Sequence, residues 1–177
     1  WYMLSFAYKW QHEKRVKTVA LPDFKQFRKD KEDDSGLVES LWELFDSADI
    51  IIAHNGDKFD IKRANTRFIE HGLKPPEPYR TVDTCKVARR HFGFNSNKLD
   101  YLGKFLGLGG KKSTPKGLWL EVLAGSKKAI KTMVDYNKRD VTLLKDVFLK
   151  LRPYVPNYIN RELFGKVGCP RCGSKKV

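Results

Sequence analysis

Apolar residues along the chain follow two spacings, one typical of strands and one typical of helices. Large side chains at every second position of residues 1–10, followed by a second such segment at 15–21, predict a hairpin. The run 49–54 is apolar, rich in β-branched residues and too short for a helix, so it predicts a strand buried on both faces. Residues 80–83 predict one further short strand.

Helical spacing of apolar residues predicts helices between and after these strands. They are expected at residues 35–45, 58–71, 84–92, 99–106 and 127–151. Ser35 is the expected N-cap of the first helix, and the polar residues 23–35 are expected to form a loop. Strands that alternate with helices after an opening hairpin predict an α/β domain with a mixed sheet over residues 1–153. Residues 154–177 are expected to form a separate tail.

The charged residues indicate what kind of partner such a domain would have. The 177 residues include 35 Lys and Arg against 21 Asp and Glu, a formal net charge of +14. A field of this sign favours a polyanion such as nucleic acid, and a solvated lysine-rich surface is the alternative. No segment reaches the roughly 18 apolar residues of a membrane-spanning helix. Three cysteines and no recognisable signal peptide lead us to expect a reducing, cytoplasmic compartment.

A first acidic cluster, Asn55-Gly-Asp-Lys-Phe59-Asp60, directly follows the apolar strand 49–54. One interpretation is a capping box, with Asp57 as N-cap of the next helix and Asp60 as its partner. The other is functional, because α/β sheets open their binding crevices at the carboxyl ends of strands. His54 has the same two interpretations, a satisfied hydrogen-bonding residue or a metal ligand, and the first is the more common.

A second cluster, Tyr136-Asn-Lys-Arg-Asp140, lies in the last predicted helix. Asp140 falls on the apolar stripe of that helix, where a carboxylate must be paired, hydrogen-bonded or metal-bound. Tyr136 lies four residues earlier and shares its face. A hydroxyl and a carboxylate so placed can hold a metal-activated water. The alternative is an ion pair of Asp140 with Arg139 or another basic residue, beside a core tyrosine.

Taken in order, the two clusters resemble known nuclease motifs. Asn55-x-x-x-Phe59-Asp60 and Tyr136-x-x-x-Asp140 are similar to the second and third motifs of ribonuclease H-like 3′–5′ exonucleases, the DnaQ-like, four-acid (DEDD) superfamily, in its tyrosine subgroup. The segments 81–84 and 99–103 look like those of YprB-like and phage-type members. The resemblance covers residues 1–152 and implies a ribonuclease H-like mixed sheet flanked by helices.

The resemblance also implies a chemistry, namely hydrolysis of DNA or RNA from a single-stranded 3′ end with two Mg²⁺ or Mn²⁺ ions. Asp140 would bind the metal ion that activates the attacking water, and Asp60 would serve the second ion. Tyr136 would orient or help deprotonate that water, while Asn55 and Phe59 would contact the terminal nucleotide. Carboxylate oxygens are ligands that such ions prefer. Asp83 matches no motif firmly, and we expect it to cap the helix 84–92.

One part of the family pattern is absent from this sequence. The first motif, Asp-x-Glu on the opening strand, has a single literal match at residues 30–32, which lie in a lysine-rich loop. We therefore expect the first, central strand of the sheet to lie upstream of Trp1, and this 177-residue chain to be inactive by itself. The rival interpretation is a non-catalytic, basic nucleic-acid-binding module whose acids serve as caps and ion pairs.

The tail contains the pair Cys169-Pro-Arg-Cys172, which resembles one knuckle of a zinc ribbon. Two thiolates supply half of a tetrahedral zinc site. We expect a second cysteine pair further downstream in a longer protein, so the tail by itself is a partial site for Zn²⁺.

Overall fold

Four short strands pair as two separate two-stranded sheets in the computed structural model, which describes residues 1–110, 115 and 117–156. Strand β1 (Ser5–Tyr8) is antiparallel to β2 (Lys17–Ala20), with Phe6 opposite Val19. Strand β3 (Ile50–Ala53) is parallel to β4 (Arg80–Asp83), with Ala53 opposite Asp83. The predicted hairpin, the two later strands and the α/β class are confirmed.

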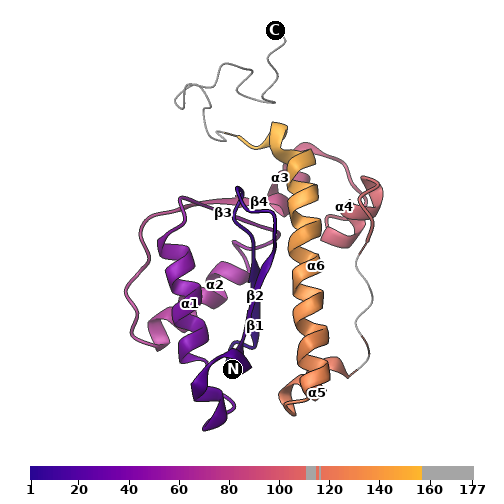
Figure 1. Ribbon diagram of the computed structural model, residues 1–177. Coiled ribbons are helices and arrows are strands. Elements are labelled where there is room, and N and C mark those ends of the chain that lie inside the picture. The colour runs from indigo at the N-terminus through magenta and orange to yellow at the C-terminus, as the bar shows by residue number, and fades with distance from the viewer. Residues whose placement is uncertain (111–114, 116, 157–177) are drawn as a thin grey trace.

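In the part of the chain that the structure describes, six α-helices flank these strands, and five of them were predicted. They are α1 (Ser35–Asp46), α2 (Asp60–Glu70), α3 (Thr84–His91), α4 (Leu99–Phe105), α5 (Leu118–Leu123) and α6 (Lys127–Leu151). Helices α1 and α2 lie on one side of the strands, whereas α3 to α6 lie on the other (Figure 1). None of the helices in the described part of the chain is long and apolar enough to cross a membrane.

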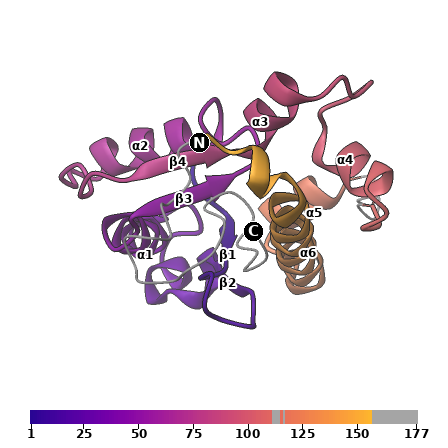
Figure 2. The same ribbon diagram turned by 90° about the horizontal axis from the view of Figure 1, so that it is seen from above.

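Three features of the fold correct the sequence predictions. Strand β3 is only half-buried along its length, because the long helix α6 packs mainly against β1 and β2 (Figure 2). The predicted loop before α1 contains two 3-10 turns, Leu21–Asp23 and Lys25–Arg28. Helix α5 was missed because its nearly continuous apolar run, Leu-Trp-Leu-Glu-Val-Leu, shows no helical period.

Among the described residues, the core consists of three clusters of buried side chains rather than one. The largest joins α3 and α4 to α6 through Ala88, Leu102 and Val147, each with no exposed surface. The second joins α5 to α6, and the third joins α1 to α2. Because α6 takes part in two of the three clusters, it is the element that connects the helices α3, α4 and α5.

A buried ion pair lies at the start of α1, and the residue that precedes this helix differs from the predicted cap. Asp34, not Ser35, precedes the helix, and its carboxylate is fully buried without capping the helix. Instead it accepts hydrogen bonds from the Met3 backbone N–H at 2.6 Å and from the guanidinium of Arg67. The charge of Arg67 on α2 is tolerated in the interior because this carboxylate compensates it.

Candidate active site

The carboxyl ends of the parallel strands β3 and β4 lie side by side, and a carboxylate joins the turns that follow them. Asp83 Oδ1 accepts the Asn55 N–H at 2.8 Å, the Cys85 N–H at 2.9 Å and the Lys86 N–H at 3.4 Å. The last two bonds make Asp83 the N-cap of α3, as predicted. The first bond ties the start of the Asn55–Asp60 motif to the next strand.

The turn after β3 has an unusual backbone. Asn55 has a φ of +62°, the one positive value of a non-glycine residue in the described part of the chain. Asparagine tolerates this left-handed conformation better than most residues do. The next residue, Gly56, is buried, and a Cβ built on it would lie 2.3 Å from the Cβ of Ala53. Only glycine fits there, so the turn can fold back tightly over the strand end.

Asp60 is the first residue of α2, and the capping-box interpretation is wrong. The N-cap is Phe59, which has no side-chain capping bond. Asp57 lies in the preceding turn, where its carboxylate pairs with Lys86 Nζ at 2.6 Å. Because the helix starts two residues later than a cap at Asp57 requires, the two acids cannot form a box.

The carboxyl of Asp60 sits in surroundings that disfavour its charge. The residue is exposed as a whole, but the loss of hydration around its carboxyl raises the pKa of Asp60. A hydrogen bond from its own backbone N–H opposes this effect, and the negative charge of Asp83 raises the pKa further. The negative charge of Asp83 therefore acts on Asp60 at the end of the parallel strand pair, and a cation there would favour the ionised forms.

Both ring nitrogens of His54 have partners within the protein. Nε2 lies 2.9 Å from the backbone carbonyl oxygen of Asn97, and Nδ1 lies 2.9 Å from the hydroxyl of Thr84. Since a carbonyl only accepts hydrogen bonds, Nε2 carries a hydrogen. His54 is therefore a structural residue that holds the loop between α3 and α4, and metal binding is not its role.

Tyr136 and Asp140 lie half-buried on α6, the helix that packs against β1. Asn137 Nδ2 donates a hydrogen bond to Ser5 Oγ at 2.7 Å, which fixes this stretch of the helix against the strand. Asp60 instead belongs to the β3–β4 pair. Across residues 1–110, 115 and 117–156, no three His, Cys, Asp or Glu side chains form a group that could hold a metal ion.

The candidate residues therefore have suitable donor atoms for divalent ions, but there are too few of them to hold two ions. Asp60 and Asp140 have the hard oxygen atoms that Mg²⁺ and Mn²⁺ prefer, yet a two-metal centre needs more carboxylates than these two. The third cysteine, Cys85, is buried and unpaired, and burial raises the pKa of its thiol, so it is no substitute ligand. Cys169 and Cys172, the predicted partial zinc site, lie outside the described residues.

Exposed aromatic and basic side chains adjoin the motif, and the motif itself includes one of them, Phe59. The ring of Phe59 is 55% exposed, and that of Trp1 is 60% exposed. The guanidinium carbon of Arg63 lies 5.4 Å from the centre of the Phe59 ring and 4.7 Å from that of Trp1. The spacing of four residues between Phe59 and Arg63 was a signal for this contact. A planar, positively charged surface of this kind suits a nucleobase and its phosphate.

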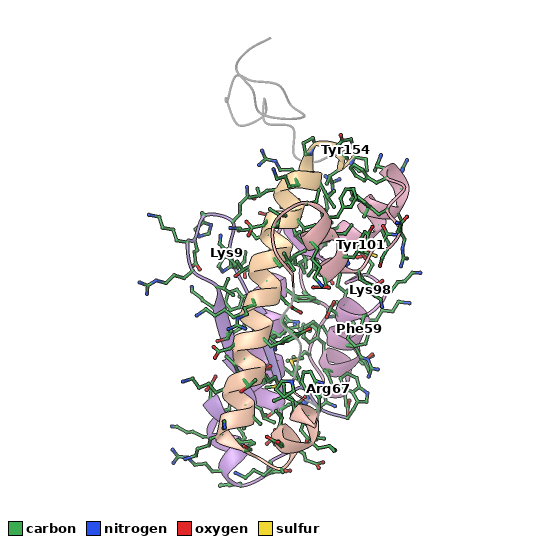
Figure 3. The ribbon with its side chains drawn as sticks, turned by 90° about the vertical axis from the view of Figure 1, so that its right-hand side faces the viewer. Lys9, Phe59, Arg67, Lys98, Tyr101 and Tyr154 are labelled. Carbon is green, nitrogen blue, oxygen red and sulfur yellow. The ribbon has the colours of Figure 1, made fainter. Side chains whose placement is uncertain are left out.

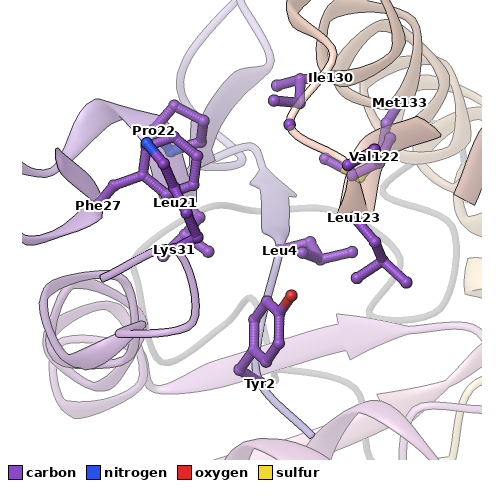
Figure 4. A pocket seen from close by; sticks show the side chains of 12 residues that line it. Tyr2, Leu4, Leu21, Pro22, Phe27, Lys31, Val122, Leu123, Ile130 and Met133 are labelled. Carbon is purple, nitrogen blue, oxygen red and sulfur yellow. The ribbon is translucent and has the colours of Figure 1, made fainter. Parts of the chain in front are cut away.

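The clearest pocket of the described residues is elsewhere. It lies between the N-terminal segment, the first 3-10 turn and the α5–α6 corner, with a volume of about 80 Å³ (Figure 4). Leu4, Leu21 and Met133 are among its mostly apolar lining residues, and no candidate active-site residue contacts it. Such a volume is far below the roughly 300 Å³ of small-ligand pockets.

Comparison with known proteins agrees with this fold. The model of a protein family described as the RNase_H superfamily matches residues 2–152, so the chain belongs to the RNase H superfamily. Members of this superfamily are nucleases. The chain is also similar to Protein NEN3 of Arabidopsis thaliana, at 38% identity over 58 residues. That match covers 32% of this chain and 12% of NEN3, so the chain corresponds to a small part of that relative.

Proposed function

We propose that this chain is part of a metal-dependent 3′–5′ exonuclease that hydrolyses the phosphodiester bonds of DNA or RNA. The observation that carries the proposal is the environment of Asp60, whose carboxyl lies at the end of a parallel strand pair beside Asp83 and has a raised pKa. A cation beside such a carboxyl favours its ionised form. Strand ends of this kind are also where α/β sheets bind their ligands.

Within the proposed site, each candidate residue has a separate task. Asp60 and Asp140 hold divalent ions, Tyr136 orients the attacking water, and Asn55 and Phe59 hold the terminal nucleotide. Bound Mg²⁺ or Mn²⁺ would supply Lewis-acid stabilisation of the reacting oxygens. The left-handed backbone of Asn55 supports its assignment, since unusual backbone conformations cluster at binding sites. The exposed ring of Phe59 supports a stacking role.

We also propose that a further β-strand supplies additional acidic residues to the site. In the described residues, β1 and β3 are each hydrogen-bonded to one strand only, so each has a free edge. A strand that pairs with both edges would unite the two sheets and could bring an Asp-x-Glu motif between Asp60 and Asp140. Backbone hydrogen bonds to both neighbours would hold such a strand in one register.

The test uses a natural protein that contains this chain and oligonucleotides labelled at the 3′ or the 5′ end. With Mg²⁺ or Mn²⁺, we expect stepwise shortening from the 3′ end. Asp60→Asn and Asp140→Asn are each expected to abolish it, whereas Asp135→Asn, an exposed acid on the same helix as Asp140, is expected to have no effect. Activity that survives in either of the first two variants would disprove the assignment.

A non-catalytic basic module is the second candidate, and one observation favours it. The described residues contain no group of three metal ligands, while the chain has a net charge of +14. Such a module would bind oligonucleotides without any metal-dependent shortening. The 177-residue chain alone is expected to behave in this way under both hypotheses, so the decision depends on the longer protein.

A further inference from the structure

A row of aromatic rings runs from the 3-10 turn after α6 (Arg152–Tyr154), past the end of α3, to α4. Neighbouring ring centres are 4.7 Å apart for Tyr154 and Phe92, 5.0 Å for Phe92 and Phe94, and 5.1 Å for Phe94 and Phe105. Tyr101 follows at 6.2 Å from Phe105. We call these five residues the aromatic ladder. Phe92, Phe94 and Tyr101 pack on the core cluster of α3, α4 and α6, so their positions are fixed.

Parts of the aromatic ladder are open to solvent. Phe105 is 63% exposed and Tyr154 is 41% exposed, although both carry large apolar rings. Exposure of rings that belong to one continuous row is unusual on a soluble surface and indicates a binding site. Exposed rings can stack with the bases of a single strand without regard to sequence.

The charge around the aromatic ladder fits a polyanion. Residues 84–110 contain five Lys and Arg, namely Lys86, Arg89, Arg90, Lys98 and Lys104, against a single acid, Asp100. Asp100 is paired with Lys104 at 2.8 Å, so the segment keeps a positive surplus. Arg89, Arg90 and Lys98 are exposed. Surfaces that bind single-stranded nucleic acid usually combine aromatic rings with basic side chains.

The aromatic ladder is also physically continuous with the candidate active site. The loop between α3 and α4 holds Phe94, and its Asn97 carbonyl bonds to His54, the residue before Asn55. Figure 3 shows the side chains of Tyr154, Tyr101, Lys98 and Phe59 following one another along one side of the molecule. A strand that ends at Phe59 could therefore continue over Lys98 onto the ladder.

We propose that the aromatic ladder, with Arg89, Arg90 and Lys98, binds the part of a single-stranded nucleic acid that precedes the terminal nucleotide. Bases stack on the exposed rings of Phe105 and Tyr154, and phosphates contact the basic side chains. The proposal rests on the proposed function for the choice of ligand. It adds a second, non-catalytic binding surface on α3, α4 and the turn after α6.

The test measures binding of fluorescein-labelled dT12 to the 177-residue chain by fluorescence anisotropy, with EDTA present so that cleavage cannot occur. The double variant Phe105→Leu/Tyr154→Leu keeps apolar side chains but removes both rings. Stacking on an aromatic ring is worth about 1–3 kcal/mol per base, so we expect binding to weaken about fivefold or more. Phe105→Tyr retains a ring and is expected to bind as the parent chain does.

Two further variants separate stacking from charge and from general surface effects. Trp119→Leu removes a ring that is 48% exposed on α5, at the far end of α6, and is expected to leave the affinity unchanged (Figure 1). Arg89→Gln/Arg90→Gln is expected to reduce the salt dependence of binding, with a slope of log K against log salt that is shallower by about 0.7 for each lost phosphate contact. Loss of the rings should leave that slope as it is.

Equal affinity of the parent chain and the double Leu variant would overturn the proposal, and so would equal weakening by Trp119→Leu. Failure of the parent chain to bind dT12 at low salt would overturn it as well. The chain could bind dT12 through the aromatic ladder while the longer protein never shortens oligonucleotides. That result would refute the exonuclease proposal but support the binding role of the aromatic ladder. The two proposals can therefore fail separately.

Discussion

Asp83 Oδ1 accepts the backbone N–H of Asn55 at 2.8 Å, so the carboxylate that caps α3 also fixes the turn ahead of Asp60. One oxygen atom thus connects the ends of β3 and β4 to the start of the helix α3. The other oxygen, Oδ2, is buried and has no hydrogen-bond partner among the described residues. Asp83 is therefore a positioning residue for the motif, and substitution of Asp83 tests this role.

Replacing Asp83 by Ala is expected to lower the free energy of unfolding by about 2–3 kcal/mol, because it removes a helix cap and leaves buried N–H groups unsatisfied. Asp83→Asn keeps a carbonyl oxygen as acceptor and is expected to lose less. Urea denaturation measures both. Asp135→Ala, at an exposed position of α6, is the control and should change little. An Asp83→Ala chain as stable as the parent would contradict this role.

Stability should depend on pH through Asp60, because its pKa is raised in the folded chain by loss of hydration and by the charge of Asp83. The stability that protonated Asp60 contributes is complete below its ordinary pKa of about 3.9 and is lost as the pH rises through the raised pKa. Asp60→Asn, which stays neutral, should therefore gain stability relative to the parent chain as the pH rises. Urea titrations from acidic to neutral pH measure this difference, and a constant difference would contradict it.

The buried ion pair of Asp34 and Arg67 is expected to contribute to the stability of the fold. Arg67→Ala leaves the fully buried carboxylate of Asp34 without its main cation, and such a loss typically costs about 3–5 kcal/mol of unfolding free energy. Arg63→Ala is a matched control, since Arg63 lies one turn earlier on the same helix and is exposed. It should cost less than about 1 kcal/mol. Equal losses in the two variants would show that the buried pair has no special weight.

The tight turn after β3 predicts that Gly56 tolerates no side chain. In Gly56→Ala the new Cβ would lie 2.3 Å from that of Ala53, so the turn and Asp60 must shift. We expect a loss of about 1–3 kcal/mol in unfolding free energy, measured in urea. Gly93→Ala is the control, because a Cβ there meets no atom within 4 Å. A Gly56→Ala chain that unfolds at the same urea concentration as the control would contradict this geometry.

Much of the local structure was predictable from short stretches of sequence. The helix α6 was expected at residues 127–151 and is found at Lys127–Leu151, because its apolar period extends over many turns. The cap at Asp83 was also correctly predicted, since its capping bonds reach only the next three residues. The roles of Asp60, Asp140, Tyr136 and their neighbours in catalysis stay predictions, to be decided by activity measurements.

Other features could not be derived from local pattern. Arg67 is buried and Ile69 is 77% exposed on the same helix, the reverse of what hydrophobicity indicates. The reason is a partner 33 residues away along the chain, Asp34, which no short window contains. In the same way, Asp57 is a plausible cap by sequence, but Lys86 on another helix holds its carboxylate.

The sequence by itself determined the α/β class, the order of most elements and the two motifs, because periodicity, caps and turns are set by neighbouring residues. Tertiary structure decided which distant groups meet. It brought Asp83 to Asn55, placed Phe94 against Phe105, and left the strands in two separate pairs. These outcomes depend on long-range packing and hydrogen bonds, whose partners lie many residues apart and are selected only when the chain has folded.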